Sequence, residues 1–369
     1  MNNAVKIIFI VLFQLLILVL LAAVIYVLYM QHQYYRIPDG EKLEVEQPQD
    51  MVLKTDEEYT ALSYNIGFGA YGPDYSFFMD SGVMADGTQV KGKYGKAMSR
   101  QSVLEHTKGV LNVLQEQKVD FALLQEVDIK AHRSYKVDQV DFLKQGMDGY
   151  SSVLAKNFHS AYLFYPFNDP HGAGEGGILT LSCAKIDSAV RRSYPVDPGF
   201  FVKFTDLDRC FALHRIPVDN GRELVLINSH MSAYDKGGLV REQQLSMLNQ
   251  LLEEEYKKGN YVIVGGDFNH ALGENVATAF MGQQQYPAWV AQLTQQDLAP
   301  NFCVQIAENE QEVPTCRAAE MPWQPGVNYA TVVDGFLVSD NVQAAAENID
   351  TNFAYSDHNP VRLTFKLLE

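Results

Sequence analysis

The sequence contains few cysteines. The four present are Cys183, Cys210, Cys303 and Cys316, and no two have the Cys-x-x-Cys spacing typical of zinc knuckles and redox motifs. This argues against a cysteine-based metal or redox site, and we expect buried thiols. If the domain is extracellular, a disulfide between Cys303 and Cys316, in a loop-like region, is the alternative.

Basic residues are also scarce. There are 29 Lys and Arg against 45 Asp and Glu, a net charge of −16, which argues against broad nonspecific binding to a polyanion. No Lys/Arg tract interleaved with aromatic residues marks a duplex-binding face. Phosphate chemistry is not excluded, because a bound metal supplies positive charge locally and the acids that hold it add to the negative count.

The amino-terminal part is the longest apolar run. Residues 7–30 are apolar apart from Gln14, and a helix needs about 20 such residues to span a bilayer. We predict a transmembrane anchor at residues 5–30. A cleaved signal peptide is the alternative, but its apolar region is about 7 to 15 residues long. Four tyrosines suit an interfacial belt: Tyr26, Tyr29, Tyr34 and Tyr35.

The charges that flank this run favour an amino terminus inside the cell and an extracellular domain at the cell membrane. Lys6 lies on one side, and the basic residues on the other side are diluted by acids, which count little in the positive-inside rule, so the opposite orientation stays open. Residues 31–57 are polar, contain Pro38 and Pro48, and suit a linker that stands the domain off the membrane. Residues 58–369 show no further composition shift and no internal repeat, which predicts one domain.

One stretch combines a strand with chemically useful residues. Residues 261–264 form an apolar, mostly β-branched run, and Gly265 and Gly266 then lead to Asp267 and Asn269. An acid at the carboxyl end of a buried strand is where open α/β sheets place their chemistry. Alone, the stretch is equally well explained as a strand that leads into an Asx turn.

Several other predicted strands end in the same way. Apolar patterns predict strands at residues 59–67, 119–127, 150–155, 174–182, 208–215, 222–230, 331–339 and 361–365, and helices at 100–118, 137–147 and 239–258. Polar side chains fall at or near the ends of three of these strands: Asn65, Glu126 and His230. Each has an ordinary explanation by itself, a solvated carboxylate or a structural histidine, and the repetition argues for a site.

Asp334 lies inside a predicted apolar strand, where an unpaired charge costs several kcal/mol. We expect a cationic or donor partner, and His358 is the best candidate, because an Asp that orients an imidazole is a common acid–base arrangement. His171 is interpreted as a loop histidine rather than a ligand. Residues 67–96, long and aromatic, are expected to roof a pocket, contact lipid or cover the core.

The ordered set of strand ends resembles the endonuclease/exonuclease/phosphatase superfamily, with its DNase I-like fold. It comprises Asn65, Gln125-Glu126, Asn228-Ser229-His230, Gly266-Asp267-Phe268-Asn269, Asp334 and Ser356-Asp357-His358. The resemblance covers residues 59–369. It implies an α/β fold in which a two-layer β-sandwich is flanked by helices, and a metal-dependent phosphoesterase site at one rim.

The resemblance also implies a metal site. Glu126 is the expected principal Mg²⁺ ligand, with Asn65 and Asp357 nearby. Mg²⁺ takes oxygen ligands and is typically held by one or two carboxylates plus waters. Mn²⁺ and Ca²⁺ are alternatives.

The remaining residues take catalytic roles by the same resemblance. Asp267 is expected to orient or deprotonate the attacking water. Asn269 and His230 are expected to donate hydrogen bonds to phosphoryl oxygens. Asp334 is expected to pair with His358 and to hold the imidazole beside the phosphate.

The segment Asn-Ser-His-Met-Ser-Ala at residues 228–233 looks more like the phospholipid-directed branches, sphingomyelinases and inositol-polyphosphate phosphatases, than the abasic-site nucleases. With the anchor and the acidic surface, it favours a phospholipid or inositol-phosphate substrate at the membrane. The alternatives are an extracellular Mg²⁺-dependent endonuclease or exonuclease acting on nucleic acid and a non-catalytic surface binding module on the same fold. No obligate protein partner is indicated.

Overall fold

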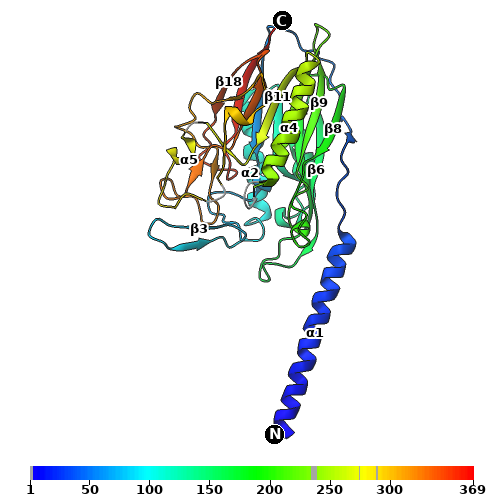
Figure 1. Cartoon of the computed structure of the whole chain (residues 1–369), viewed down its shortest axis with the longest axis vertical. Coiled ribbons are helices and arrows are strands. Elements are labelled where there is room, and N and C mark those ends of the chain that lie inside the picture. The colour runs from blue at the N-terminus through cyan, green and yellow to red at the C-terminus, as the bar shows by residue number, and fades with distance from the viewer. Residues whose placement is uncertain (1–2, 234–238, 274, 288–289) are drawn as a thin grey trace.

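The structure is a computed structural model that describes residues 3–233, 239–273, 275–287 and 290–369. Two large sheets form the domain that follows the amino-terminal helix (Figure 1). The first has the order β1 (Glu41–Leu43), β8 (Ser188–Ser193), β9 (Cys210–Pro217), β10 (Glu223–His230), β11 (Tyr261–Asp267), β17 (Asp334–Ser339) and β14 (Phe302–Gln305). The second has the order β18 (Val342–Asn348), β19 (Val361–Leu367), β2 (Glu58–Asn65), β5 (Phe121–Asp128), β7 (Gly172–Ser182) and β6 (Ser151–Leu163).

The two sheets pack face to face, with helices on the outside. Phe121 and Leu123 of β5 share one buried core with Leu226 of β10 and Ile263 of β11. The outer face of the first sheet is covered by α4 (Leu239–Lys257), and that of the second by α2 (Arg100–Gln117) and α3 (Gln139–Gly146). This confirms the predicted two-layer sandwich flanked by helices.

Two parallel strand pairs bring the polar strand ends to one edge. β2 runs parallel to β5, and α2 connects them; β10 runs parallel to β11, and α4 connects them. Asn65 pairs in register with Gln125, and His230 pairs with Asp267. Parallel strands end at the same edge of a sheet. The carboxyl ends of all four strands therefore lie at one rim of the sandwich, which we call the catalytic edge.

Short elements complete the chain. They are β3 (Ser81–Val83) paired with β4 (Gln89–Lys91), β12 (Ala271–Leu272) with β13 (Gln292–Leu293), β15 (Cys316–Arg317) with β16 (Ala330–Thr331), and α5 (Val276–Ala279). The strand predicted at residues 331–339 is two strands, β16 and β17, so Asp334 begins a strand instead of lying within one.

The segment predicted to be a spacer is attached to the domain. β1 pairs with the edge strand β8, and single bridges join Glu46 to Ser152 and Leu53 to Val218. The segment therefore runs along the sandwich, away from the catalytic edge, to the start of β2. The sequence predicts a polar linker over residues 31–57, and the structure shows that part of this segment pairs with the sandwich.

The cysteines also differ from expectation. All four are free, so Cys303 and Cys316 form no disulfide. Cys303 is exposed on β14. Cys316 lies on β15, and its backbone forms an isolated β-bridge with His358. Only Cys210 is fully buried, and the expectation of buried thiols holds for that residue alone.

The helix α1 (Asn3–Gln33) projects from the domain at the end opposite the carboxyl terminus (Figure 1). Its most apolar window has a mean hydropathy of 3.3, and none of that window is buried. The helix is long and apolar enough to cross a membrane, and a signal sequence at this position has the same properties.

Candidate active site

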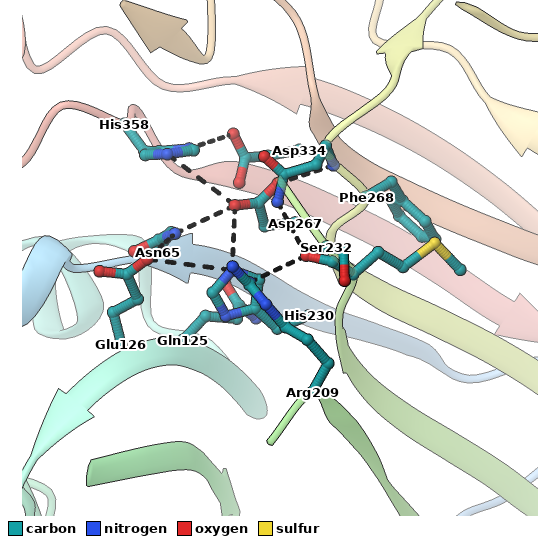
Figure 2. A network of polar contacts seen from close by, with 12 residues as sticks. Asn65, Gln125, Glu126, Arg209, His230, Ser232, Asp267, Phe268, Asp334 and His358 are labelled. Atoms are coloured by element: carbon teal, nitrogen blue, oxygen red, sulfur yellow. Dashed lines mark hydrogen bonds and ion pairs between the residues drawn. The ribbon is translucent and has the colours of Figure 1, made fainter. Parts of the chain in front are cut away.

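Asp267, the last residue of β11, lies at the centre of the catalytic edge (Figure 2). Asn65 donates from Nδ2 to its Oδ2 at 3.1 Å, and the backbone N–H of Asn269 donates to its Oδ1 at 2.9 Å. The Nε2 atoms of His230 and His358 lie 3.5 and 3.9 Å from Oδ2. The structure thus brings together residues from four separate segments around one buried carboxylate.

Asp334 and His358 form the predicted pair. Asp334 is opposite Asp267 in the antiparallel register of β17 and β11, and its Oδ2 lies 2.7 Å from His358 Nδ1. Burial lowers the pKa of His358, but the charge and hydrogen bond of Asp334, together with Cys316, outweigh burial and raise the pKa well above 6.5. The imidazole is therefore a cation with its Nε2–H available on the side of Asp267.

Glu126 reaches the edge because of an irregularity in β5. The register between β5 and β7 shifts between Leu124 and Val127, and Glu126 has a left-handed backbone with φ of 53°. A bulge inserts one extra residue and re-aims its side chain, and such features occur next to active sites. The Glu126 side chain is 21% exposed, so solvent reaches the cluster of otherwise buried polar side chains at this residue.

The electrostatics at Glu126 favour a bound cation. Burial raises the pKa of Glu126, Arg133 lowers it, and the nearby charge of Asp357 raises it again. Burial likewise raises the pKa of Asp357. Two partly buried carboxylates that disfavour each other's charge fit a divalent metal with oxygen ligands, which would remove the repulsion.

The side-chain amide nitrogen of Asn65 faces Glu126. Its Nδ2 lies 3.5 Å from Glu126 Oε1, and its Oδ1 accepts from the backbone N–H of Gly67 at 3.0 Å. An amide oxygen has two lone pairs, and Gly67 occupies one of them. Asn65 can therefore bind a metal only through the second lone pair of Oδ1.

A second cluster of possible ligands, two aspartates and a histidine, lies nearby but is less suited to bind a metal. Ligand atoms of Asp267, Asp334 and His358 lie within 4.8 Å of one another. The Nδ1 of His358 is already bonded to Asp334, and the raised pKa keeps its proton on Nε2. A protonated imidazole donates hydrogen bonds and is not a metal ligand. The donor chemistry therefore favours Glu126 and Asp357 as metal ligands.

His230 differs from its predicted role as a donor. Its Nε2 lies 2.5 Å from Nη1 of Arg209, which also donates to the carbonyl of Met231 at 2.9 Å. Burial and the charge of Arg209 lower the pKa of His230 well below 6.5. The neutral imidazole accepts from the guanidinium, so its Nε2 has no proton to donate to phosphate in this arrangement.

Asn269 has the left-handed backbone, with φ of 51°, that tight turns after a strand require. Its Nδ2 donates to the carbonyl of Met231 at 3.0 Å, and its own carbonyl accepts from Arg241 Nη1 at 3.2 Å. The amide carries a second N–H hydrogen, as the predicted contact to a phosphoryl oxygen requires.

Sequence reasoning missed the arginines of the site. Arg209 precedes β9, and Arg133 pairs with Asp128 by a bidentate contact at 2.9 and 3.1 Å. Arg317 donates to the carbonyls of Tyr71 and Gly72. All three guanidiniums are buried. A single Arg has no sequence signal of its own. Only its position beside apolar strand segments could have indicated that these arginines are buried.

The aromatic segment at residues 67–96 covers the core. Phe68, Tyr71 and Tyr75 are buried in one cluster. Next to it lies His171, whose Nδ1 is 2.5 Å from the carbonyl of Gly95. Burial lowers the pKa of His171 to about 3. Of the three expectations, the structure supports core covering by these aromatic rings.

The two packed sheets flanked by helices form a fold of the DNase I-like type. The sequence profile of the Endonuclease/Exonuclease/phosphatase family matches residues 62–358. The chain therefore belongs to this family, whose hydrolases act on phosphoester bonds with a divalent metal.

Solved structures show the same fold at low identity. An endonuclease/exonuclease/phosphatase from Beutenbergia cavernae is 14% identical with a TM-score of 0.53, covering 84% of this chain and 72% of that one. A family protein from Leptotrichia buccalis is 13% identical with a TM-score of 0.52, covering 84% and 100%. TDP2 of D. rerio, complexed with single strand DNA product, is 14% identical with a TM-score of 0.51, covering 84% and 100%. Comparison with curated protein sequences gives no match.

Proposed function

We propose that this protein is an Mg²⁺-dependent phosphoesterase that uses an activated water to hydrolyse a phospholipid or inositol-phosphate type substrate at a membrane surface. The observation that carries the proposal is the position of Asp267. Its buried carboxylate lies 3.9 Å from Nε2 of His358 and 3.1 Å from Asn65 Nδ2, at the edge where Glu126 is partly exposed.

The residues divide the chemistry among themselves. Asp267 accepts the proton of the attacking water. His358, held as a cation by Asp334, donates from Nε2 to a phosphoryl oxygen, and Asn269 donates from its amide. Arg209, positioned by His230, supplies a further positive charge.

Glu126 and Asp357 would hold the metal, with Asn65 as a third ligand. A bound Mg²⁺ supplies Lewis-acid neutralisation of charge on the phosphoryl and leaving oxygens. This division requires that both carboxylates are ionised when the metal binds, which the positive charge of the metal favours.

Two features support a lipid-type substrate. The helix α1 is long and apolar enough to keep the domain at a bilayer, where headgroup phosphates are concentrated. The net charge of −16 disfavours association with a long polyanion. Orientation with the domain outside the cell is part of the same proposal.

A nuclease is the second candidate. The observation that favours it is the D. rerio TDP2 structure, whose complex contains a single strand DNA product. The shared fold is compatible with either substrate, because function depends on the site and not on the fold.

A substrate panel separates the candidates. The full chain, purified in detergent, is assayed against phosphatidylinositol phosphates, sphingomyelin, single-stranded DNA and plasmid DNA, with Mg²⁺ and with excess EDTA. We expect turnover of a lipid substrate that EDTA abolishes and Mg²⁺ restores. Cleavage of DNA alone would establish the nuclease instead.

Two variants test the site itself. Asp267→Asn and His358→Ala are expected to lower turnover by orders of magnitude, because they remove the proton acceptor and the cationic donor. Activity that is unchanged in both variants would refute the assignment. Absence of turnover on every substrate would favour a non-catalytic binding module.

A further inference from the structure

Two connections at the catalytic edge carry exposed aromatic residues. The strand register shows where two connections leave the sheets. β6 ends and β7 begins past the Asp128–Gly176 pair, at the carboxyl end of β5. β8 ends where Ser193 pairs with Cys210, and Cys210 in turn pairs with His230. The β6–β7 connection, residues 164–171, and the β8–β9 connection, residues 194–209, therefore leave the sandwich on the side of the site. Their position relative to the site follows from the strand topology and does not depend on the proposed function.

These connections expose large apolar side chains to solvent. Phe167 is 86% exposed and Phe201 is 71% exposed, and their neighbours Phe164, Tyr165 and Phe200 are about half exposed. Single exposed apolar residues need no explanation, but aromatic residues gathered on one surface mark an interaction site. We call these five residues the aromatic surface.

The end of α1 contacts both connections. Tyr26 donates to the carbonyl of Tyr162, at the end of β6, and its ring packs edge-on against Phe164 at 5.5 Å. Lys203 in the β8–β9 connection donates to Gln31 at 2.7 Å and lies over the ring of Phe200. The aromatic surface is thus continuous with the apolar helix.

Helix length fixes the depth of this contact. The 31 residues of α1 extend about 46 Å at 1.5 Å per residue, whereas the hydrocarbon core is about 30 Å thick. A span of about 20 residues that begins at Ile7 ends near Tyr26. Phe164, which packs on Tyr26, then lies at the level of the lipid headgroups, where aromatic rings and snorkelling Lys side chains are favoured.

We infer that the aromatic surface enters the interface of the bilayer that α1 spans, and holds the catalytic edge toward the lipid headgroups. The inference rests on α1 being a membrane span, as in the proposed function. It adds a second attachment, which would orient the domain and limit its rotation about the helix. The carboxyl terminus lies at the end of the domain opposite α1 (Figure 1), and the start of β2 is beside it, because Glu58 pairs with Lys366.

The test is a depth measurement that does not depend on catalysis. Full-length Phe167→Trp and Phe201→Trp variants are reconstituted in phosphatidylcholine nanodiscs with and without lipids brominated near the headgroup, and the quenching of the native tryptophans is subtracted. Met51→Trp is the control, because Met51 is also exposed, at 40%, but forms a β-bridge with Ala184 at the far end of the sandwich. We expect strong quenching at positions 167 and 201 and none at position 51.

Equal quenching at all three positions, or none at any, would overturn the inference. This includes the case in which the aromatic surface binds a second copy of the chain or another protein. Quenching in an inactive protein would leave the inference standing and refute the proposed function alone.

A kinetic test is independent of the fluorophores. The Phe167→Ser/Phe201→Ser double variant is expected to hydrolyse soluble bis(p-nitrophenyl) phosphate at the wild-type rate and a lipid substrate in nanodiscs at least 10-fold more slowly. An equal loss on both substrates would indicate damage to the site, and no loss on lipid would contradict an orienting role.

Discussion

Replacing Asp334 by Asn tests the central electrostatic argument. The carboxylate lies 2.7 Å from His358 Nδ1 and is the main reason that the pKa of this buried imidazole is raised above 6.5. Asn keeps the shape but removes the charge. Without that charge the pKa of His358 falls below its wild-type value, so that the imidazole of the variant loses its proton at a lower pH than that of the wild type.

The expected loss follows from that change. Removing one preorganised donor from a transition-state site lowers kcat by about 10²–10³, or about 2.7–4 kcal/mol. The cation is present below its pKa, so wild-type activity falls only as the pH rises through the raised value. In Asp334→Asn the alkaline limb of kcat/KM should move to lower pH. The assay is hydrolysis of bis(p-nitrophenyl) phosphate at saturating Mg²⁺ across the pH range.

Asp340→Asn is the matched control, because Asp340 follows the same strand β17 at its other end and is exposed. It should leave both kcat and the pH profile unchanged. An alkaline limb that stays at the wild-type pH in Asp334→Asn would refute the claim that Asp334 holds His358 as a cation, even if the rate falls.

The remaining predictions concern the metal, the second histidine and pH stability. Glu126→Gln should weaken Mg²⁺ binding at least 10-fold in calorimetric titrations, whereas Glu175→Gln, at a partly exposed acid of β7, should not. Arg209→Met should raise the pKa of His230 in NMR titrations of labelled histidine, and Arg209→Lys should shift it less, because the charge is kept. Burial alone would raise the pKa of Glu255, but hydrogen bonds from Arg215 and other donors lower it to about 2, so the ionised form stabilises the fold above the ordinary value of 4.5 and this contribution is lost as the pH falls toward 2. Glu255→Gln should therefore cost about 1–3 kcal/mol at pH 7 in urea denaturation, and the difference should vanish near pH 2.

The sequence predicted the strands and the residues at their ends because both depend on local patterns. Apolar runs identify buried strands, and the first polar residue after such a run, as at Asp267, marks the edge. The pair of Asp334 and His358 followed from one physical rule, that a buried charge needs a partner. The structure confirms that contact.

The position of Glu126 could not be predicted from alternation. Phe121 and Leu123 face the core between the sheets, and Leu124 faces the helices. A regular strand would place Glu126 among the apolar residues under α2 and α3. Instead Val127 takes that place, and the bulge releases Glu126 to the edge. Only the pairing with β7, a long-range contact, determines this shift.

Arg209 and the linker were missed for a different reason. Arg209 directly precedes β9, and the pairing of Cys210 with His230 brings the Arg209 side chain to His230; no periodicity in the sequence encodes this contact. The linker carries no apolar pattern, yet β1 joins the sheet through backbone hydrogen bonds, which are available to polar segments as well.

The two sheets contribute different halves of the site. Asn65 and Glu126 belong to one sheet and Asp267 to the other, and a buried hydrogen bond of 2.8 Å from Gln125 to Asn228 joins the sheets beneath them. The separation between the proposed metal ligands and the proton acceptor is consequently set by the thickness of the hydrophobic core. Natural selection on turnover would then act on apolar residues that never meet the substrate, and repacking this core for a higher melting temperature would change the rate as well.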